Sequence, residues 1–251
     1  MEILPIKTKV IKAEDNLAKI ILDSIYNQGI EIKNGDIIAI SSKVISATTK
    51  RIINLKKIKP SNKAQELAKK YSLEPEFVEL ILKECEKIYG GVKKAILTLK
   101  NGILTVNAGV DHKNAPKGYA SLWPMNPQLE ADKLRKEIEE ATGRKVGVLI
   151  VDSEVSPLRL GTRGLALAVS GFCPVIDYRG RKDLYGKEIL ITQHSIADDI
   201  ASAAHALMGE SSELTPVVII RNVPITLDEN AKSEEMKISR EKCVYASSFK
   251  L

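Results

Sequence analysis

Three short runs of apolar, mostly β-branched residues constrain the fold of this 251-residue chain more than any other feature. They read GDIIAIS at 35–41, VGVLIVD at 146–152 and PVVIIRN at 216–222. Each run is short for a helix and apolar throughout its interior, which is typical of a strand buried on both faces. Helical patterns separate the runs along the chain, so the sequence predicts an α/β fold.

The segments around these strands carry their own signals. Asp15 is placed to cap a helix whose apolar residues keep helical spacing from Leu17 to Ile25. An Asn101-Gly102 pair between KAILTLK and ILTVNAG predicts a β-hairpin with a type I′ turn. Further helices are expected to begin at Pro60-Ser61 and at Pro75, to cover 132–141 before Gly143, to cover 196–209, and to follow Ser233; further strands are expected at 2–6 and 187–193.

The hairpin argues against a purely parallel sheet, so the expected fold class is mixed α/β. Residues 160–171, rich in Gly and Ala, should pack tightly. No linker marks a domain boundary. We expect one unit over residues 1–251, made of two closely packed lobes, with candidate boundaries near residue 215 or inside 60–90.

Composition narrows the class of protein. The net charge is +6 and the pI is about 9.0, but the basic residues are interspersed with 32 acidic ones and only 4% of residues are aromatic. These features favour a lysine-rich solvated surface over a nucleic-acid site, and positive potential could attract an anionic small molecule. No apolar run approaches the roughly 20 residues of a membrane span, and the N-terminus lacks a signal-peptide pattern. We expect a cytoplasmic protein with three free thiols.

Two segments after predicted strands could bind a metal. Asp152 ends a buried run, where open α/β sheets bind ligands, and a carboxylate there suits Mg²⁺ or Mn²⁺. An acid at this position also commonly caps a turn. Asp111 and Asn114 offer oxygen donors after the small residues Asn107 to Gly109, whereas His112 between them is expected to lie at the surface.

Two further segments could bind anions or a nucleotide. MGESSE at 208–213 follows a helix, although a cap with a polar loop explains it equally. YRGRKDLYG at 178–186 combines three basic residues with turn residues, and it suits phosphate, carboxylate or plain solvent. The chain has no Walker A, GxGxxG, GxSxG or HExxH motif. The residues alone therefore indicate a metal-dependent, phosphate-handling α/β enzyme.

The order of these motifs resembles that of the coenzyme F420-0:L-glutamate ligase family over nearly the whole chain. The resemblance rests on Asn107-Ala-Gly-Val-Asp111 with Asn114, Asp152, Gly180-Arg-Lys-Asp-Leu-Tyr-Gly186, Ala197-Asp198 and Met208-Gly209-Glu210. It implies a two-lobed, intertwined homodimer with the active site near lobe and subunit contacts. It also implies that GTP phosphorylates a carboxylate, here that of F420-0, and that the amine of L-glutamate attacks the acyl phosphate to form an amide. Mg²⁺ or Mn²⁺ is the implied metal, with K⁺ as an additional candidate ion.

The resemblance also assigns roles to individual residues. Metal ligands fall on Asp111, Asp152, Ser153 and Glu210. Nucleotide contacts fall on Lys9, Val10, Ile11, Ser41, Ser42, Asn114, Gly209 and Ser211. Asp152 and Arg159 are the expected catalytic residues.

Several positions depart from the family pattern. A nucleotide-binding lysine falls on Ala47, so a phosphate partner is missing unless Lys43 or Lys50 replaces it. A Gly-Arg pair becomes Val155-Ser156, an acidic stretch becomes Asn126-Pro-Gln128, and glycines become Ser211 and Ser212. Three hypotheses follow: a GTP-dependent ligase acting on F420-0, a diverged ligase with another acceptor, amine or nucleotide, and a binding protein that kept only the fold.

Overall fold

A five-stranded mixed sheet forms the centre of the protein in the computed structural model, which describes residues 1–248. Its strand order is β1 (Glu2–Ile6), β12 (Val217–Arg221), β2 (Ile37–Ser41), β8 (Gly147–Val155) and β9 (Thr162–Ser170). Only β2 and β8 run parallel; the other neighbours are antiparallel. The prediction of a mixed α/β fold is confirmed.

Both faces of the sheet are covered, as the three apolar runs predict. Side chains alternate along each strand, so Ile38 and Ile40 of β2 join one apolar cluster while Ile37 and Ala39 join another. The first cluster packs against helices α1 (Leu17–Asn27) and α5 (Pro127–Thr142), and the second packs against α6 (Ile196–Met208). The sheet is therefore a buried layer between helices, and its strand ends are where polar groups can reach solvent.

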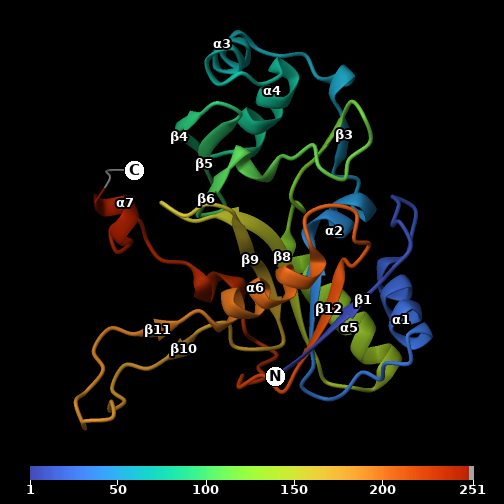
Figure 1. The fold of residues 1–251 in the computed structure, drawn as a ribbon, viewed down its shortest axis with the longest axis vertical. Coiled ribbons are helices and arrows are strands. Elements are labelled where there is room, and N and C mark those ends of the chain that lie inside the picture. The colour runs from blue at the N-terminus through green and yellow to red at the C-terminus, as the bar shows by residue number, and fades with distance from the viewer. Residues whose placement is uncertain (249–251) are drawn as a thin grey trace.

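Residues 52–122 form a third apolar cluster, above the central sheet in Figure 1. Its core side chains come mainly from two helices, among them Ala64, Ala68, Phe77 and Ile81. The elements of this segment are β3 (Ile52–Asn54), α3 (Asn62–Tyr71), α4 (Pro75–Glu84), β4 (Lys87–Val92), β5 (Ala95–Lys100), β6 (Ile103–Val106) and β7 (Tyr119–Ser121). We call this segment the upper unit. Helix α2 (Ser42–Thr48) connects the central sheet to it.

Most of the predicted elements form, with corrected ends. Asn101 and Gly102 both have positive φ, as a type I′ turn requires. Helix α1 is capped by Asn16 rather than Asp15, whose carboxylate instead accepts the Lys12 N–H. Helix α5 begins at Pro127, five residues before the predicted start, because the Asn126 side chain caps it. Gly143 ends it in the left-handed conformation, as expected.

The predicted strand at 187–193 is wrong. Regular strand pairing is confined to Gln193–His194 (β11) with Ile176–Asp177 (β10). The rest of 178–192 extends away from the body as a long ribbon, whose two sides are joined by an isolated bridge between Lys182 and Glu188 and by scattered backbone hydrogen bonds. Its apolar side chains Leu184, Tyr185 and Ile191 are almost fully exposed. The tail is only partly helical, with a 3-10 turn at Ser233–Met236 and a short helix α7 (Val244–Ser248). No helix within residues 1–248 is both long and apolar enough to cross a bilayer.

Candidate functional site

The candidate site lies beneath the upper unit, where β2 ends and its pairing with β8 stops, although β8 itself continues to Val155. Ser41 of β2 pairs with Val151 of β8, so Ser42 and Asp152 follow side by side at the carboxyl edge of the sheet. Open α/β sheets bind ligands at this edge. Two cavities, of about 390 Å³ and about 190 Å³, meet here and share Lys43, Asp152 and Ser153.

The larger cavity brings together segments that are distant in sequence. The nucleotide residues implied by the resemblance that line it are Lys9, Val10, Ile11, Ser41, Asn114, Gly209 and Ser211. Ala47, Ser212, Met208, Leu214 and Pro216 complete much of its wall. Aliphatic side chains and small residues dominate this surface, which suits a flat ring and a sugar more than a compact ion.

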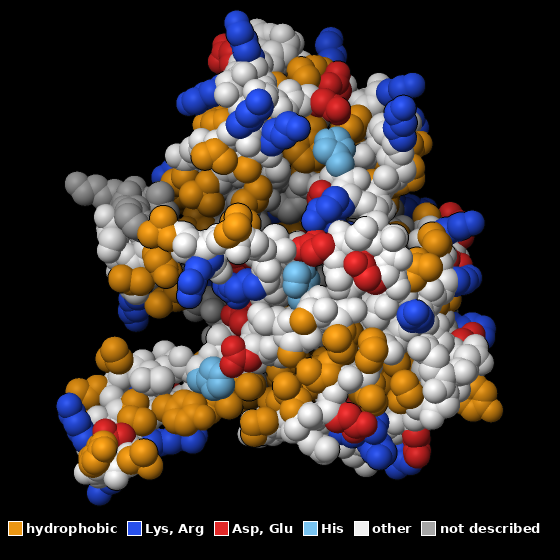
Figure 2. Space-filling model, in the orientation of Figure 1, with side chains coloured by type: hydrophobic (Ala, Val, Ile, Leu, Met, Phe, Trp, Pro, Cys, Tyr) orange, Lys and Arg blue, Asp and Glu red, His pale blue; other side chains and the backbone are white. Residues whose placement is uncertain are grey.

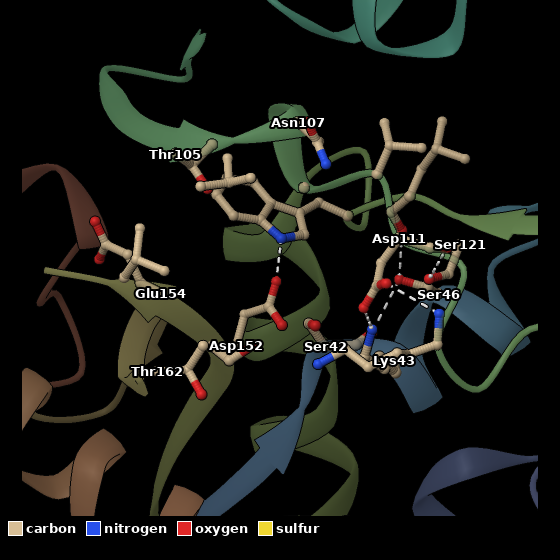
Figure 3. A pocket seen from close by; sticks show the side chains of 18 residues that line it. Ser42, Lys43, Ser46, Thr105, Asn107, Asp111, Ser121, Asp152, Glu154 and Thr162 are labelled. Atoms are coloured by element: carbon tan, nitrogen blue, oxygen red, sulfur yellow. Dashed lines mark hydrogen bonds and ion pairs between the residues drawn. The ribbon is translucent and has the colours of Figure 1, made fainter. Parts of the chain in front are cut away.

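The smaller cavity has charged side chains on several sides. Asp111, Lys113, Asp152 and Glu154 line it together with Lys43, and hydroxyl and amide groups fill the gaps between them. Ser42 faces this cavity rather than the larger one. Figure 3 shows Lys43 and Asp111 on one side, Glu154 on the opposite side, and Asp152 between them.

Asp152 lies at the junction of the two cavities. Its carboxylate accepts a hydrogen bond from the indole Nε1 of Trp123. Burial raises the pKa of the Asp152 carboxyl above its ordinary value, although the Lys43 ammonium and the Ser153 backbone N–H favour the ionised form. A carboxylate in such surroundings gains stability from any cation that binds beside it.

A buried ionic network in the upper unit supports Trp123. Lys100 donates to Glu84 at 2.6 Å and lies 5.4 Å above the Trp123 ring, in a cation–π geometry. Arg51 donates to Glu84 at 2.6 Å and to the Trp123 carbonyl at 2.9 Å. Burial would raise the pKa of Glu84, but these two cations hold it below its ordinary value. Trp123 is therefore held at its ring face by Lys100 and at its backbone carbonyl by Arg51.

The other two candidate carboxylates pair with lysines. Lys43 Nζ contacts Asp111, and Lys113 Nζ lies 2.7 Å from Glu210. Glu210 also accepts from Thr162 at 2.5 Å and lies 3.1 Å from His205 Nε2. Burial would raise the pKa of Glu210, but the Lys113 and Thr162 hydrogen bonds outweigh it and hold the pKa at about 2. Glu210 is therefore ionised at neutral pH.

Comparison with known proteins identifies the family. The model of the family described as F420-0:Gamma-glutamyl ligase matches residues 5–222. The chain belongs to this family. It is 44% identical to the coenzyme F420:L-glutamate ligase of Methanocaldococcus jannaschii, over 85% of this chain and 86% of that one. It is 40% identical to the corresponding ligase of Methanococcus maripaludis strain C6 and 35% identical to that of Archaeoglobus fulgidus, over 96% of each chain in both cases. As a member of the F420-0:gamma-glutamyl ligase family, the protein is a ligase.

The structure bears on two positions that depart from the family pattern. The first is Ala47, where the family pattern has a nucleotide-binding lysine. Lys43 lines both cavities and Lys50 lines neither, so Lys43 is the lysine placed to take over this role. Ser211 has its backbone N–H bound to Glu213 at 2.8 Å. Gly209 must remain glycine, because its φ is +71° and an added Cβ would collide with the Glu213 side chain.

The residues assigned as metal ligands have the donor atoms that Mg²⁺ and similar ions prefer. Asp111, Asp152, Ser153 and Glu210 present only oxygen atoms, which Mg²⁺ and Mn²⁺ prefer. Within residues 1–248, no three acidic, His or Cys side chains converge on one point that could hold a metal. Mg²⁺ is commonly held by one or two carboxylates together with substrate phosphates, so this open arrangement fits the ion.

Arg159, an expected catalytic residue, lies away from both cavities. It lies in the exposed loop after β8 and lines neither cavity. The loop projects because Gly161 and the preceding residues make no strand pairing. Its catalytic role therefore finds no geometric support in a single chain.

Sequence reasoning missed several lining residues, including Trp123, Lys113, Glu154 and Thr162. One of them carried a signal. Glu154 lies two residues after Asp152 on the same strand, so the strand period places both on one face. Burial raises the pKa of Glu154 to about 7, against the opposing effect of Arg163. The others reach the site through tertiary packing.

Proposed function

We propose that the protein is a GTP- and divalent-metal-dependent ligase that joins the carboxylate of F420-0 to the amine of L-glutamate. The observation that supports this most is the junction of the two cavities at Lys43, Asp152 and Ser153. A ligase of this kind must bring a nucleotide phosphate and an acceptor carboxylate to one point. The family description supplies the acceptor F420-0, and the names of the relatives, coenzyme F420:L-glutamate ligases, supply the amino acid.

The reaction would proceed in two steps. A carboxylate oxygen of the acceptor attacks the γ-phosphorus of GTP, the bond to GDP breaks, and an acyl phosphate forms. The amine nitrogen of L-glutamate then attacks the carbonyl carbon. The carbon–oxygen bond to phosphate breaks, phosphate leaves with the electron pair, and the amine gives up a proton as the amide forms.

Residues at the junction have distinct tasks in this scheme. The larger cavity would hold GTP, with its phosphates toward Lys43. When Lys43 turns to the phosphates, it releases the Asp111 carboxylate, with which it is paired in the structure. Asp111 and Asp152, with Ser153 and Glu210, would then hold Mg²⁺ or Mn²⁺, which neutralises phosphate charge when bound.

The test is direct. GTP is titrated calorimetrically into the protein with and without Mn²⁺, with ATP alongside, and GDP, phosphate and glutamylated product are then measured with F420-0 and L-glutamate present. We expect Mn²⁺-dependent GTP binding and equimolar GDP and amide. Metal-dependent binding followed by turnover of another carboxylate would favour a diverged ligase. A folded protein that binds neither nucleotide would contradict the proposal and favour a binding protein.

We also propose that the protein is a homodimer. The ribbon 178–192 stands clear of the body and carries exposed apolar and basic side chains in Figure 2, and its Leu184 and Tyr185 have no packing partners among residues 1–248. Isolated ribbons of this kind are rarely stable without a surface to cover them. Light scattering should give twice the chain mass for the wild type and the single chain mass for Leu184→Glu. A monomeric wild type would contradict the proposal.

A further inference from the structure

The smaller cavity has a size and charge pattern that the nucleotide does not explain. Its volume of about 190 Å³ is below the roughly 300–1,000 Å³ usual for pockets that bind drug-sized ligands. The body of a large cofactor-like acceptor cannot enter such a space, but a single amino acid can. It also opens onto Asp152, where the proposed acyl phosphate would form.

Glu154 is the acceptor group of this cavity that no other residue satisfies. The cation within ion-pair distance of it, among residues 1–248, is Arg163, whose Nη2 lies 3.8 Å away. Arg163 is itself engaged with the Ser156 hydroxyl at 2.7 Å and the Gly164 carbonyl. The Glu154 carboxylate therefore retains capacity to accept N–H donors from a ligand.

The charges near Glu154 favour an amine over a carboxylate. Asp152 and Asp198 both act electrostatically on Glu154, and Arg163 is the one cation that offsets them. A second carboxylate brought here would be repelled, whereas an ammonium group would be attracted. This end of the cavity, opposite Lys43 and Asp111 in Figure 3, thus selects the amine-bearing substrate.

The opposite wall supplies donors for carboxylates. The Asn107 Oδ1 accepts the Ile96 backbone N–H at 2.9 Å, which fixes the amide orientation and leaves Nδ2 free to donate. Figure 3 shows that nitrogen on the lower side of the amide, toward the part of the view where Asp152 and Lys43 lie. Lys113 lines the same cavity, and its ammonium is paired with Glu210 at 2.7 Å but has further N–H groups to donate. A small dicarboxylic amino acid has an amine that Glu154 can accept and two carboxylates to which Asn107 and Lys113 can donate.

We infer that the smaller cavity is the amino-acid subsite, in which Glu154 receives the amine and Asn107 and Lys113 receive carboxylates. This inference rests on the proposed ligase function. It places the amine on the side of Asp152 away from the Lys43–Asp111 pair, so that the nucleophile and the phosphoryl donor approach the junction from different cavities.

The experiment separates the two half-reactions with Glu154→Gln. Hydroxylamine, a small nucleophile that needs no amino-acid subsite, traps an acyl phosphate as a hydroxamate. With GTP, Mn²⁺ and F420-0, the wild type and Glu154→Gln should give equal hydroxamate. The KM for L-glutamate should rise roughly 10- to 100-fold in Glu154→Gln, as expected for the loss of a charged hydrogen bond. Glu140→Gln, on the exposed face of α5, is the matched control and should change neither value.

Glutarate, which is L-glutamate without the amine, sharpens the test. Its inhibition constant should be unchanged or lower in Glu154→Gln, because only the amine interaction is lost. An unchanged KM for L-glutamate, or an equal weakening of glutarate and L-glutamate, would overturn the inference. Absence of hydroxamate in the wild type would instead overturn the ligase proposal on which it rests.

Discussion

The two cavities share three residues but recognise ligands in different ways. The larger one is walled mostly by loops, aliphatic side chains and small residues such as Ala47 and Ser211, with charged residues such as Glu213 among them. The smaller one is walled by charged side chains that already bind one another, as Lys43 does Asp111. A change at a small residue of the first wall breaks no side-chain pair, whereas a change at Lys43 or Asp111 removes the partner of the other. The family departures at Ala47, Ser211 and Ser212 fall on this first wall, the tolerant wall, whereas the departure at Val155 lines the smaller cavity.

The shared carboxylate should give the largest effect, because both cavities depend on it. Asp152→Asn should lower turnover roughly 10³-fold or more, since it removes a negative charge that the metal and the phosphoryl transfer both require. The amide oxygen can still accept from Trp123, so the folded structure should persist. Steady-state assays and a thermal melt check this together. A variant with near-normal turnover would place the junction elsewhere.

Glu154→Gln should change stability in a pH-dependent way in metal-free protein. The folded pKa is about 7 and the ordinary value is 4.5, so ionisation is disfavoured in the folded state. Below pH 4 both states are protonated and no difference is expected. As pH rises from 4.5 to 7 the wild type loses stability that the neutral amide keeps, up to about 3 kcal/mol at pH 8. Urea unfolding at pH 4 and pH 8 measures this, and equal differences at both pH values would contradict it.

Lys43→Met tests whether one cation serves both cavities. Loss of a charged partner should lower kcat/KM for GTP roughly 10- to 100-fold. Lys50→Met is the matched control, because Lys50 follows the same helix and lines neither cavity. A larger effect from Lys50 than from Lys43 would reverse the assignment of the phosphate partner.

Trp123→Phe tests the smaller cavity alone. The variant keeps an aromatic ring for Lys100 but removes the N–H that Asp152 accepts. We expect roughly a tenfold loss in kcat, with an unchanged Kd for GTP, because one hydrogen bond to a charged group is lost. Equal losses in kcat and GTP affinity would show that the indole supports both cavities.

The tolerant wall should give the smallest effect. Ser211→Gly with Ser212→Gly restores the family glycines and should change the Kd for GTP by less than about threefold, within the usual range of surface substitutions. Calorimetry against the wild type measures it. A gain of tenfold or more would show that the two hydroxymethyl groups obstruct the nucleotide.

Sequence patterns anticipated the larger cavity better than the smaller one. The sheet, its buried strands and the end of β2 follow from periodicity, whereas the loop residues from Lys9 to Ile11 and at Gly209 and Ser211 are assigned through the family resemblance. Trp123 and Lys113 reach the site only because the upper unit folds over the sheet. Their partners lie far away in sequence, as with Arg51 and Glu84, and no local pattern records such pairings.

The failed strand at 187–193 has a related cause. The segment KEILITQ has the β-branched composition of a strand. Composition indicates that a segment can form a strand, but it does not indicate which strand it would pair with. In this chain the segment pairs irregularly with residues 177–183, through isolated backbone hydrogen bonds and one bridge at Glu188, and Leu190 and Ile191 remain exposed. Arg159 illustrates the same limit for function, because motif order assigned it a role that its place in an exposed loop does not support.

The contact between Trp123 and Asp152 has a practical consequence. Trp123 is the only tryptophan in the chain. Its ring also lies beneath the Lys100 ammonium, so its excited state senses two charges at once. The intrinsic fluorescence of the unmodified protein, excited at the indole band, therefore originates beside the junction of the two cavities. Titration of Mn²⁺, nucleotide or amino acid can be followed there optically, with no label and no background from a second indole.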